Sequence, residues 1–345
     1  MHSPQFVQTP AQLADLVTVL HSADAVAVDT EFVGEGLYEP LLCLIQIATR
    51  EGIWIVDPLA VPSTEPFWES VTAPEREFVV FAAREELRFC LRYARRVPAR
   101  LLDIQLAAGL VGYGYPLSHS NAVRKALNVT LPGSEAFTDW RKRPLTQSQI
   151  DYAADDVRHL LPMRDKLADR ARRLGRSEWL ADESQKFADR LAVEEQEERW
   201  WKVPGSSNLR RRELGVLREV WRWRDSVARR DGVPPRRVLR DELLVEVARR
   251  KPRTTADLFA LRGMERGPAR NAGAEIVRSV QTALDLPDEE LPTSLRRDDV
   301  PQLSSLSQLL SVVANGLAAE HHVDPQLLAT ASDLQDLVRW KLGAP

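Results

Sequence analysis

The first hundred residues alternate short apolar runs with amphipathic stretches, a pattern typical of an α/β domain. Four runs rich in Val, Ile and Phe predict strands: Ala25–Phe32, Cys43–Thr49, Gly52–Asp57 and Glu77–Ala82. The first three lie too close together for parallel connections, which need about a dozen residues or more. We therefore expect these three strands to form a hairpin-connected meander.

Helix start signals follow the strands. A helix is expected from about Glu85 to Arg95, and Asp103 and Ser118 are residue types that cap helix N-termini. The helix after Ser118 is expected to run to about Leu127. The run Thr146-Gln147-Ser148-Gln149 has the layout of a capping box. It predicts one long helix that continues to Leu174 with a kink at Pro162.

Beyond residue 200 the pattern changes to helices alone. The stretch Trp200–Asn208 contains Pro, Gly and two Ser, which indicates a linker. Helical periodicity then covers four segments: Leu209–Arg230, Val238–Arg250, Ala256–Leu261 and Ala272–Leu284. An acidic stretch with prolines, Leu286–Pro301, leads into a short helical tail.

The chain is too long for one ordinary domain, because single cores usually stop growing at about 250–300 residues. Its 345 residues divide into five predicted parts. They are an α/β domain (1–200), a linker (201–207), a helical module (208–285), a second linker (286–302) and a C-terminal helical segment (303–345).

The composition excludes several classes of protein. With 44% hydrophobic and 28% charged residues, the chain is neither disordered nor collagen-like nor a coiled-coil rod. No run approaches the roughly 18 apolar residues that cross a membrane, and the start of the chain lacks the layout of a signal peptide. We therefore expect a cytoplasmic protein without a membrane partner. The two cysteines, Cys43 and Cys90, are too few for a disulfide scaffold or a cysteine-based zinc site.

The charge is unevenly distributed. The whole chain carries −3, but residues 203–284 contain 19 Lys and Arg against 10 Asp and Glu. Such a basic module is typical of polyanion binding, although arginine bias from base composition is an alternative explanation. Six of its arginines are candidates for phosphate contacts: Arg210, Arg211, Arg222, Arg236, Arg237 and Arg240.

Two groups of acids are candidates for chemistry. Asp29 and Glu31 lie two residues apart on a strand and share one face, where a hard metal ion would neutralise them. A solvated sheet edge with two ordinary acids is the alternative. Tyr152 and Asp156 lie one helical turn apart, so a phenol and a carboxylate could hold a water together. The alternative there is an acidic helix start that complements the helix dipole.

Taken together, these motifs resemble the ribonuclease D family, within the DEDD superfamily of 3′–5′ exonucleases. The matching pieces are Asp29-Thr30-Glu31-Phe32, Leu44-Ile45-Gln46-Ile47, Leu102-Asp103-Ile104-Gln105, Thr138-Asp139-Trp140-Arg141, Arg143-Pro144-Leu145 and Tyr152-Ala153-Ala154-Asp155-Asp156-Val157. The resemblance implies an RNase H-like exonuclease fold, with a mixed sheet and helices, in which four acids hold two divalent ions, Mg²⁺ or Mn²⁺. A tyrosine four residues before the last acid indicates the tyrosine type of the superfamily.

One motif departs from the family pattern. The second exonuclease motif usually reads His-Ala-x-x-x-Asp, and this chain has Phe81-Ala82-Ala83-Arg84-Glu85-Glu86. Glu86 therefore stands where the family has Asp, and Glu85 is a fallback ligand. The resemblance implies as metal ligands Asp29, Glu31, Glu86 and Asp156. With them it implies Tyr152 as a catalytic residue that orients the attacking water, since a phenol has an ordinary pKa of about 10.

The basic module resembles the helicase-and-RNase-D C-terminal (HRDC) domain. The similarity lies in Trp221-Arg222, Val233-Pro234-Pro235, Leu239-Arg240-Asp241 and Leu261-Arg262-Gly263. The segment 303–345 is similar to a partial second module of this kind. The chain contains no Gly-Lys dipeptide and hence no Walker phosphate loop, so we expect no use of ATP.

The function implied by these resemblances is that of a metal-dependent 3′–5′ exoribonuclease that trims RNA 3′ ends, with tRNA precursors as the substrate. Two alternatives stay open at this point. One is a nucleic-acid-binding protein of the same fold whose catalysis is weakened or lost through Glu86. The other is a 3′–5′ DNA exonuclease, because contacts to the 2′-hydroxyl cannot be identified in the sequence.

Overall fold

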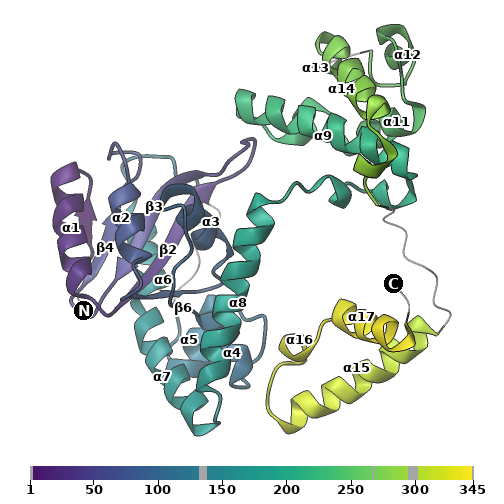
Figure 1. Cartoon of the computed structure of the whole chain (residues 1–345). Helices are drawn as coiled ribbons and strands as arrows, with labels where there is room; N and C mark the ends of the chain where they lie inside the picture. The colour runs from purple at the N-terminus through teal and green to yellow at the C-terminus, as the bar shows by residue number, and fades with distance from the viewer. Residues whose placement is uncertain (1–2, 132–137, 266–267, 294–301, 344–345) are drawn as a thin grey trace. The chain divides into compact units, whose positions relative to one another are not determined.

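The computed structural model describes residues 3–131, 138–265, 268–293 and 302–343 (Figure 1). Part of the predicted second linker, residues 294–301, lies outside the described residues. The chain divides into two compact units. The first unit contains residues 1–33, 42–196 and 300–344, and the second contains residues 34–41 and 197–299.

The first unit is built on a mixed sheet of six strands in the order β1-β4-β3-β2-β5-β6. Strands β3 and β4 are antiparallel, whereas the pairs β1–β4, β2–β5 and β5–β6 are parallel. The strands are β1 (Gln5–Val7), β2 (Ala25–Val33), β3 (Leu41–Ala48), β4 (Ile53–Val56), β5 (Glu77–Val80) and β6 (Leu101–Asp103). The predicted meander is confirmed, because β2, β3 and β4 are neighbours in that order.

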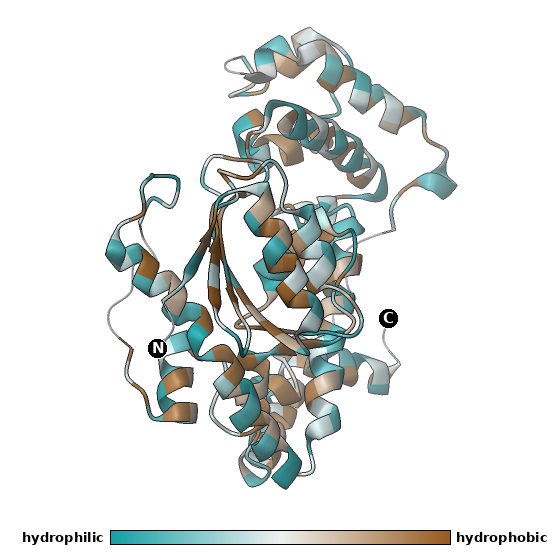
Figure 2. Ribbon diagram, turned by 90° about the vertical axis from the view of Figure 1, so that its left-hand side faces the viewer, coloured by the Kyte–Doolittle hydropathy of each residue, from teal (hydrophilic) through white to brown (hydrophobic). Residues whose placement is uncertain are grey.

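Helices cover both faces of this sheet. One hydrophobic core joins a face of the sheet to α1 (Pro10–Ser22), α2 (Glu65–Val71) and α3 (Arg84–Tyr93). The other core contains residues of α4 (Ile104–Leu110), α5 (His119–Leu127), α6 (Gln147–Arg158) and α7 (Leu160–Arg173). Helix α8 (Ser177–Gln196) contributes to both. Figure 2 shows the hydrophobic residues gathered in the strands, as burial on both faces requires.

The predicted helix caps are confirmed. Thr146 and Gln149 form a reciprocal capping box at the start of α6. The side chain of Asp103 accepts from the backbone N–H of Gln105 at the start of α4, and that of Ser118 accepts from Asn121 in α5. Each cap satisfies N–H groups that have no partner within their helix.

The helix predicted from Thr146 to Leu174 is present but interrupted, three residues before the expected kink at Pro162. The structure has two helices, α6 and α7, which meet at His159. Pro162 has no N–H to donate to the carbonyl of Arg158, and its ring would clash with that carbonyl in a continuous helix. The chain therefore breaks three residues before the proline, and Asp156 lies in the last turn of α6.

The second unit is helical. It contains α9 (Arg211–Asp231), α10 (Pro235–Val238), α11 (Asp241–Arg250), α12 (Thr255–Phe259), α13 (Pro268–Asn271) and α14 (Gly273–Asp285) around a core of its own. The predicted helix Val238–Arg250 is wrong at its start, because Leu239 is extended (φ −153°) and α11 begins only after Arg240. Tyr38 also belongs to this unit and donates a hydrogen bond of 2.9 Å to Asp225.

The C-terminal helices α15 (Leu303–Glu320), α16 (Pro325–Leu328) and α17 (Ala331–Leu342) group with the first unit. Asp324 accepts a hydrogen bond of 2.9 Å from the backbone N–H of Tyr115, and its own N–H donates to the carbonyl of Gly109. A Cβ atom at Gly109 would lie 2.4 Å from Cδ1 of Leu327 and 2.8 Å from Cβ of Tyr115, so a larger residue would force these neighbours to shift. In the described part of the chain, no helix is both long and apolar enough to cross a membrane.

Candidate active site

The structure brings the four predicted acids into mutual electrostatic reach. Asp29 and Glu31 lie on β2, Glu86 lies in the first turn of α3 and Asp156 in the last turn of α6. Burial, followed by the charges of Asp156, Glu86 and Glu31, raises the pKa of Asp29 well above its usual range. Burial and the charges of Asp156 and Glu86 raise the pKa of Glu31 to about 8.

The two acids on helices are perturbed in the same direction. Burial raises the pKa of Glu86 to about 7, against the opposing effect of a hydrogen bond from Thr30. Burial raises the pKa of Asp156 to about 7, against a hydrogen bond donated by Tyr152. Four carboxyl groups that hold protons this strongly are also groups whose charge a cation would stabilise.

The position of Glu86 is set by contacts on both sides of it. Its Oε1 atom accepts a hydrogen bond of 2.7 Å from the Thr30 hydroxyl. The carboxylate of the buried Asp103 accepts bonds of 3.0 Å from the backbone N–H groups of Ala82 and Ala83, directly before α3. Ala82 adopts a left-handed conformation (φ 60°), which is rare for a residue with a side chain. Asp103 therefore holds a strained entry into the helix that carries Glu86.

Glu85, the fallback ligand, has another partner. Its carboxylate pairs with Arg88 one turn further along α3, at 2.6 Å, and its side chain is 28% exposed. The side chain of Glu86 is buried and acts on the pKa values of Asp29 and Glu31. The structure thus places Glu86, and not Glu85, among the other acids.

The matched segment around Trp140 packs against α6 and is bonded to residues of the sheet unit. The buried Trp140 ring lies 6.1 Å from the ring of Tyr152. Arg143 donates two hydrogen bonds to Asp57, of 2.6 and 2.7 Å, and a third of 2.8 Å to the carbonyl of Cys43. These contacts fix the segment to the sheet, so that Trp140 limits the positions open to the tyrosine.

Sequence reasoning missed His119, in the first turn of α5. Its Nδ1 atom lies 3.6 Å from Oδ1 of Asp156, and its ring packs edge-on against Phe81 with 5.3 Å between ring centres. Burial, and then the charge of His159, lowers the pKa of His119 to about 4. The sequence signal that could have identified His119 is the absence of the usual histidine at position 81, because a histidine from another segment could then occupy the same region.

The donor set fits divalent ions that prefer oxygen ligands. All four groups are carboxylates, and Oδ2 of Asp156 is a buried atom without a hydrogen-bond partner. Within the described part of the chain, no three His, Cys, Asp or Glu side chains stand close enough to enclose an ion.

The candidate phosphate-binding arginines lie in the second unit, which is separate from the unit that carries the four acids. All six predicted ones are exposed: Arg210, Arg211, Arg222, Arg236, Arg237 and Arg240. Arg222 also pairs with Glu198 at 2.7 Å and with Glu219 at 2.8 Å. Arg224 of the same helix cannot meet a phosphate, because it is 4% exposed and bound to Asp241 at 2.7 Å.

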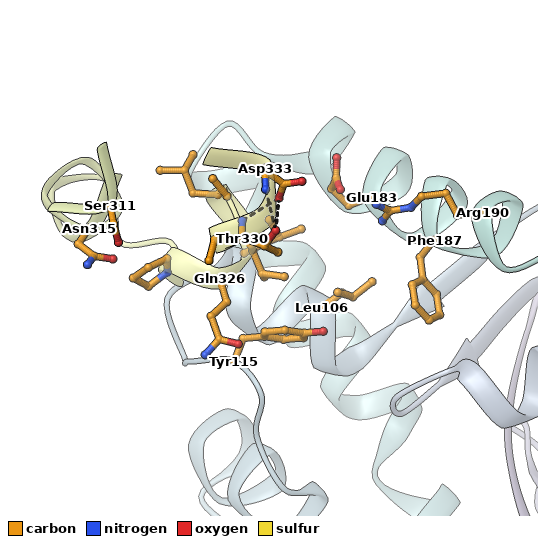
Figure 3. Close-up of a pocket in the computed structure, with 16 residues that line it drawn as sticks. Leu106, Tyr115, Glu183, Phe187, Arg190, Ser311, Asn315, Gln326, Thr330 and Asp333 are labelled. Atoms are coloured by element: carbon orange, nitrogen blue, oxygen red, sulfur yellow. Dashed lines mark hydrogen bonds between the residues drawn. The ribbon is translucent and has the colours of Figure 1, made fainter. Parts of the chain in front are cut away.

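A separate cavity of about 750 Å³ lies between the C-terminal helices and helices α4 and α8 (Figure 3). Its lining mixes polar and apolar side chains, among them Leu106, Tyr115, Phe187, Arg190 and Asp333. Of the described residues that line it, none is one of the four acids. This hollow is therefore distinct from the acidic site.

Two family models match the chain. The model described as 3′–5′ exonuclease matches residues 4–172, and the HRDC domain model matches residues 213–280. The first match contains all four acids and Tyr152. The second contains four of the six exposed arginines: Arg222, Arg236, Arg237 and Arg240.

Relatives similar over nearly the whole chain carry one name. The ribonuclease D of Gluconacetobacter diazotrophicus is 36% identical over 338 residues, which cover 97% of this chain and 86% of that protein. The ribonuclease D of Granulibacter bethesdensis is 32% identical, with the same coverage of each chain. Among solved structures, Escherichia coli RNase D, described as an exoribonuclease involved in structured RNA processing, matches with a TM-score of 0.86 and 28% identity. That match covers 99% of this chain and 92% of the other.

Proposed function

This chain belongs to the ribonuclease D family of 3′–5′ exoribonucleases, and from that premise we propose that its four clustered acids hold two divalent ions and hydrolyse RNA from the 3′ end. The observation that carries the proposal is the shared electrostatic environment of Asp29, Glu31, Glu86 and Asp156. It supports an enzyme over a binding protein that has lost its catalysis, because Glu86 keeps its place beside the other acids despite its extra methylene group.

The ions would supply charge neutralisation at the phosphodiester and activation of the attacking water. The chain supplies their ligands, Asp29, Glu31, Glu86 and Asp156. Tyr152 donates a hydrogen bond to Asp156, which keeps that carboxyl more acidic than burial alone would leave it. The same hydroxyl can orient a water beside Asp156, and the Trp140 ring behind it restricts its movement.

The substrate proposed for this site is structured RNA, with tRNA precursors as the class that the family resemblance implies. The related E. coli enzyme is described as acting in structured RNA processing. In this chain the basic module at 208–285 would add affinity through its exposed arginines, because phosphate contacts supply most of the sequence-independent binding energy. Location in the cytoplasm stays a prediction.

A comparison of substrates and metals tests this function. Matched RNA and DNA oligonucleotides with a structured 5′ part and a single-stranded 3′ overhang are incubated with Mg²⁺, Mn²⁺ or EDTA. We expect stepwise shortening of the RNA with either ion and none in EDTA. Faster degradation of the DNA would favour the DNA exonuclease alternative, and an inactive wild type with every ion would favour the binding protein.

A further inference from the structure

We propose that His119 is a positioning residue for Asp156, supplied by α5 in place of the histidine that the second exonuclease motif lacks at Phe81. This inference rests on the proposed function, because it gives His119 a part in holding a ligand of the catalytic ions. It concerns a residue outside every motif that relates the chain to its family.

The contact between His119 and Asp156 is direct. Nδ1 of the imidazole lies 3.6 Å from Oδ1 of the carboxylate, and the two side chains are 18% and 13% exposed. This separation is longer than that of a formed hydrogen bond. Catalytic hydrogen bonds are often long without substrate and tighten in the complex. A neutral imidazole with its proton on Nδ1 would then donate to Oδ1 of Asp156.

Separate contacts hold the ring of His119 and the start of the helix that carries it. Phe81 meets it edge-on at 5.3 Å, with an angle of 75° between the ring planes, a favourable geometry for two aromatic rings. Gln105 of α4 donates a hydrogen bond of 2.8 Å to the carbonyl of Leu117, two residues before His119, and Ser118 caps the helix. The start of α5 is thus fixed by a glutamine from one of the matched motifs.

Phe81 and His119 are spatial neighbours although 38 positions separate them in the sequence. An imidazole at position 81 would therefore lie beside the one at position 119. The chain has an apolar ring where the motif has a histidine, and a histidine on the helix that this apolar ring contacts. If the imidazole is supplied from position 119 and the apolar ring from position 81, both the missing motif histidine and the presence of His119 beside Phe81 are explained.

The other titratable groups around His119, Asp155 and His159, do not take over its contact with Asp156. Asp155 and His159 act on it electrostatically, but Asp155 pairs with Arg158 at 2.8 Å. His159 lies at the break between α6 and α7. Nε2 of His119 is buried without a hydrogen-bond partner, as is Oδ2 of Asp156. The polar contact of the ring is therefore directed at Asp156 through Nδ1.

The test compares four variants of the full chain: His119→Phe, His119→Asn, the exchange Phe81→His with His119→Phe, and His159→Asn as the matched control. Asparagine can present an amide N–H near the place of Nδ1, whereas phenylalanine removes the donor and keeps the ring. Each variant is measured for kcat and KM on single-stranded RNA, for Mn²⁺ affinity by calorimetry without RNA, and for thermal unfolding in EDTA.

Loss of a group that orients a metal ligand typically costs 10- to 100-fold, so we expect His119→Phe to lower kcat or Mn²⁺ affinity by about tenfold or more, with KM within about twofold. His119→Asn and the exchange should each recover most of that loss, and His159→Asn should behave like the wild type. A His119→Phe protein with wild-type kcat and Mn²⁺ affinity would overturn the proposal. So would a loss that His119→Asn and the exchange both fail to recover. The calorimetry distinguishes this failure from failure of the proposed function, since it needs no turnover.

Discussion

Thr30 donates a hydrogen bond of 2.7 Å to Glu86 across 56 residues of sequence. Thr30 lies between Asp29 and Glu31 on β2, so the strand that carries two of the acids also holds the third. The bond gives the longer side chain a fixed anchor. Under the proposed function, this anchor would let a glutamate serve where the family motif has an aspartate.

Loss of this anchor should weaken metal binding without unfolding the protein. Thr30→Val keeps the shape of the side chain and removes the donor, so we expect Mn²⁺ affinity to fall by about tenfold. Thr30→Ser keeps the hydroxyl and is the matched control. Calorimetric titration with Mn²⁺ measures the effect, and equal affinities for Thr30→Val and the wild type would show that the bond does not prepare Glu86.

Glu86 itself should be required, and its length should set the choice of ion. Glu86→Ala is expected to lower kcat by a factor of about 100 or more, because losing a ligand should cost at least as much as losing a residue that orients one, which costs about 10- to 100-fold. The wild type should prefer Mn²⁺, whose coordination is more flexible than the strict octahedron of Mg²⁺. Glu86→Asp should retain activity and shift the preference toward Mg²⁺. Full activity of Glu86→Ala in rate assays with both ions would remove Glu86 from the site.

The raised pKa of Glu31 predicts a pH-dependent stability of the metal-free protein. Because its folded pKa is about 8 and its ordinary value is 4.5, its favourable contribution is complete below about pH 4.5 and is lost as the pH rises toward 8. Glu31→Gln mimics the protonated acid at every pH. We therefore expect it to stabilise the protein at pH 8 by about 1–2 kcal/mol, after allowance for solvent screening, and hardly at all near pH 4.5.

Thermal or urea unfolding in EDTA at several pH values measures this difference. Glu51→Gln, an exposed acid of the same unit, is the control and should show no such trend. A Glu31→Gln effect that is the same at pH 4.5 and pH 8 would contradict the raised pKa.

The basic module should contribute affinity and not chemistry. A deletion after Gly205 would also remove α15–α17, which belong to the first unit, so point variants are the cleaner experiment. Arg237→Ala with Arg240→Ala should weaken binding to long RNA and reduce the slope of log K against log salt by about 0.7–0.9 per lost phosphate contact. Binding is measured in an Asp156→Ala background, which prevents degradation.

Arg222→Ala provides the comparison for that experiment. Its guanidinium is already shared with Glu198 and Glu219, so its removal should change the slope less. An unchanged slope in the double variant would show that the exposed arginines of α10 and the turn after it do not meet RNA.

What the sequence predicted well are features set by neighbouring residues. The caps at Asp103, Ser118 and Thr146 depend on side chains within three residues of the helix start, and all three are present. Strands β2 to β5 follow from local apolar runs. The four acids were assigned through resemblance to a family, and the structure brings them into electrostatic reach of one another.

What the sequence could not predict depends on distant contacts. Strands β1 and β6 have three residues each and exist only because they pair with β4 and β5. The role proposed for His119 depends on its contact with Asp156, which lies on another helix. The grouping of α15–α17 with the first unit involves contacts between distant residues, among them the hydrogen bond from Tyr115 to Asp324 and the approach of Leu327 to Gly109, which no periodicity shows. Arg224 resembled its exposed neighbours in sequence and is buried by the packing of α9 on α11.

Tyr152 should matter less than the acids. Tyr152→Phe removes the hydroxyl that Asp156 accepts from, while the ring can keep its contact with Trp140. We expect kcat to fall by about 10- to 100-fold, within the range of general acid–base and orienting contributions, with Mn²⁺ affinity close to that of the wild type. Loss of Mn²⁺ binding in this variant would instead make the tyrosine part of the ligand shell.

The most direct test of the central claim is the release of mononucleotides from a 5′-labelled RNA with a 3′ overhang, compared between the wild type and Asp156→Ala. Removing this carboxylate leaves too little negative charge for the ions, while the fold and the basic module stay intact. The wild type should shorten the RNA one nucleotide at a time with Mg²⁺ or Mn²⁺. Asp156→Ala should bind the same RNA and leave it full length. Wild-type shortening by Asp156→Ala would contradict the assignment of the active site.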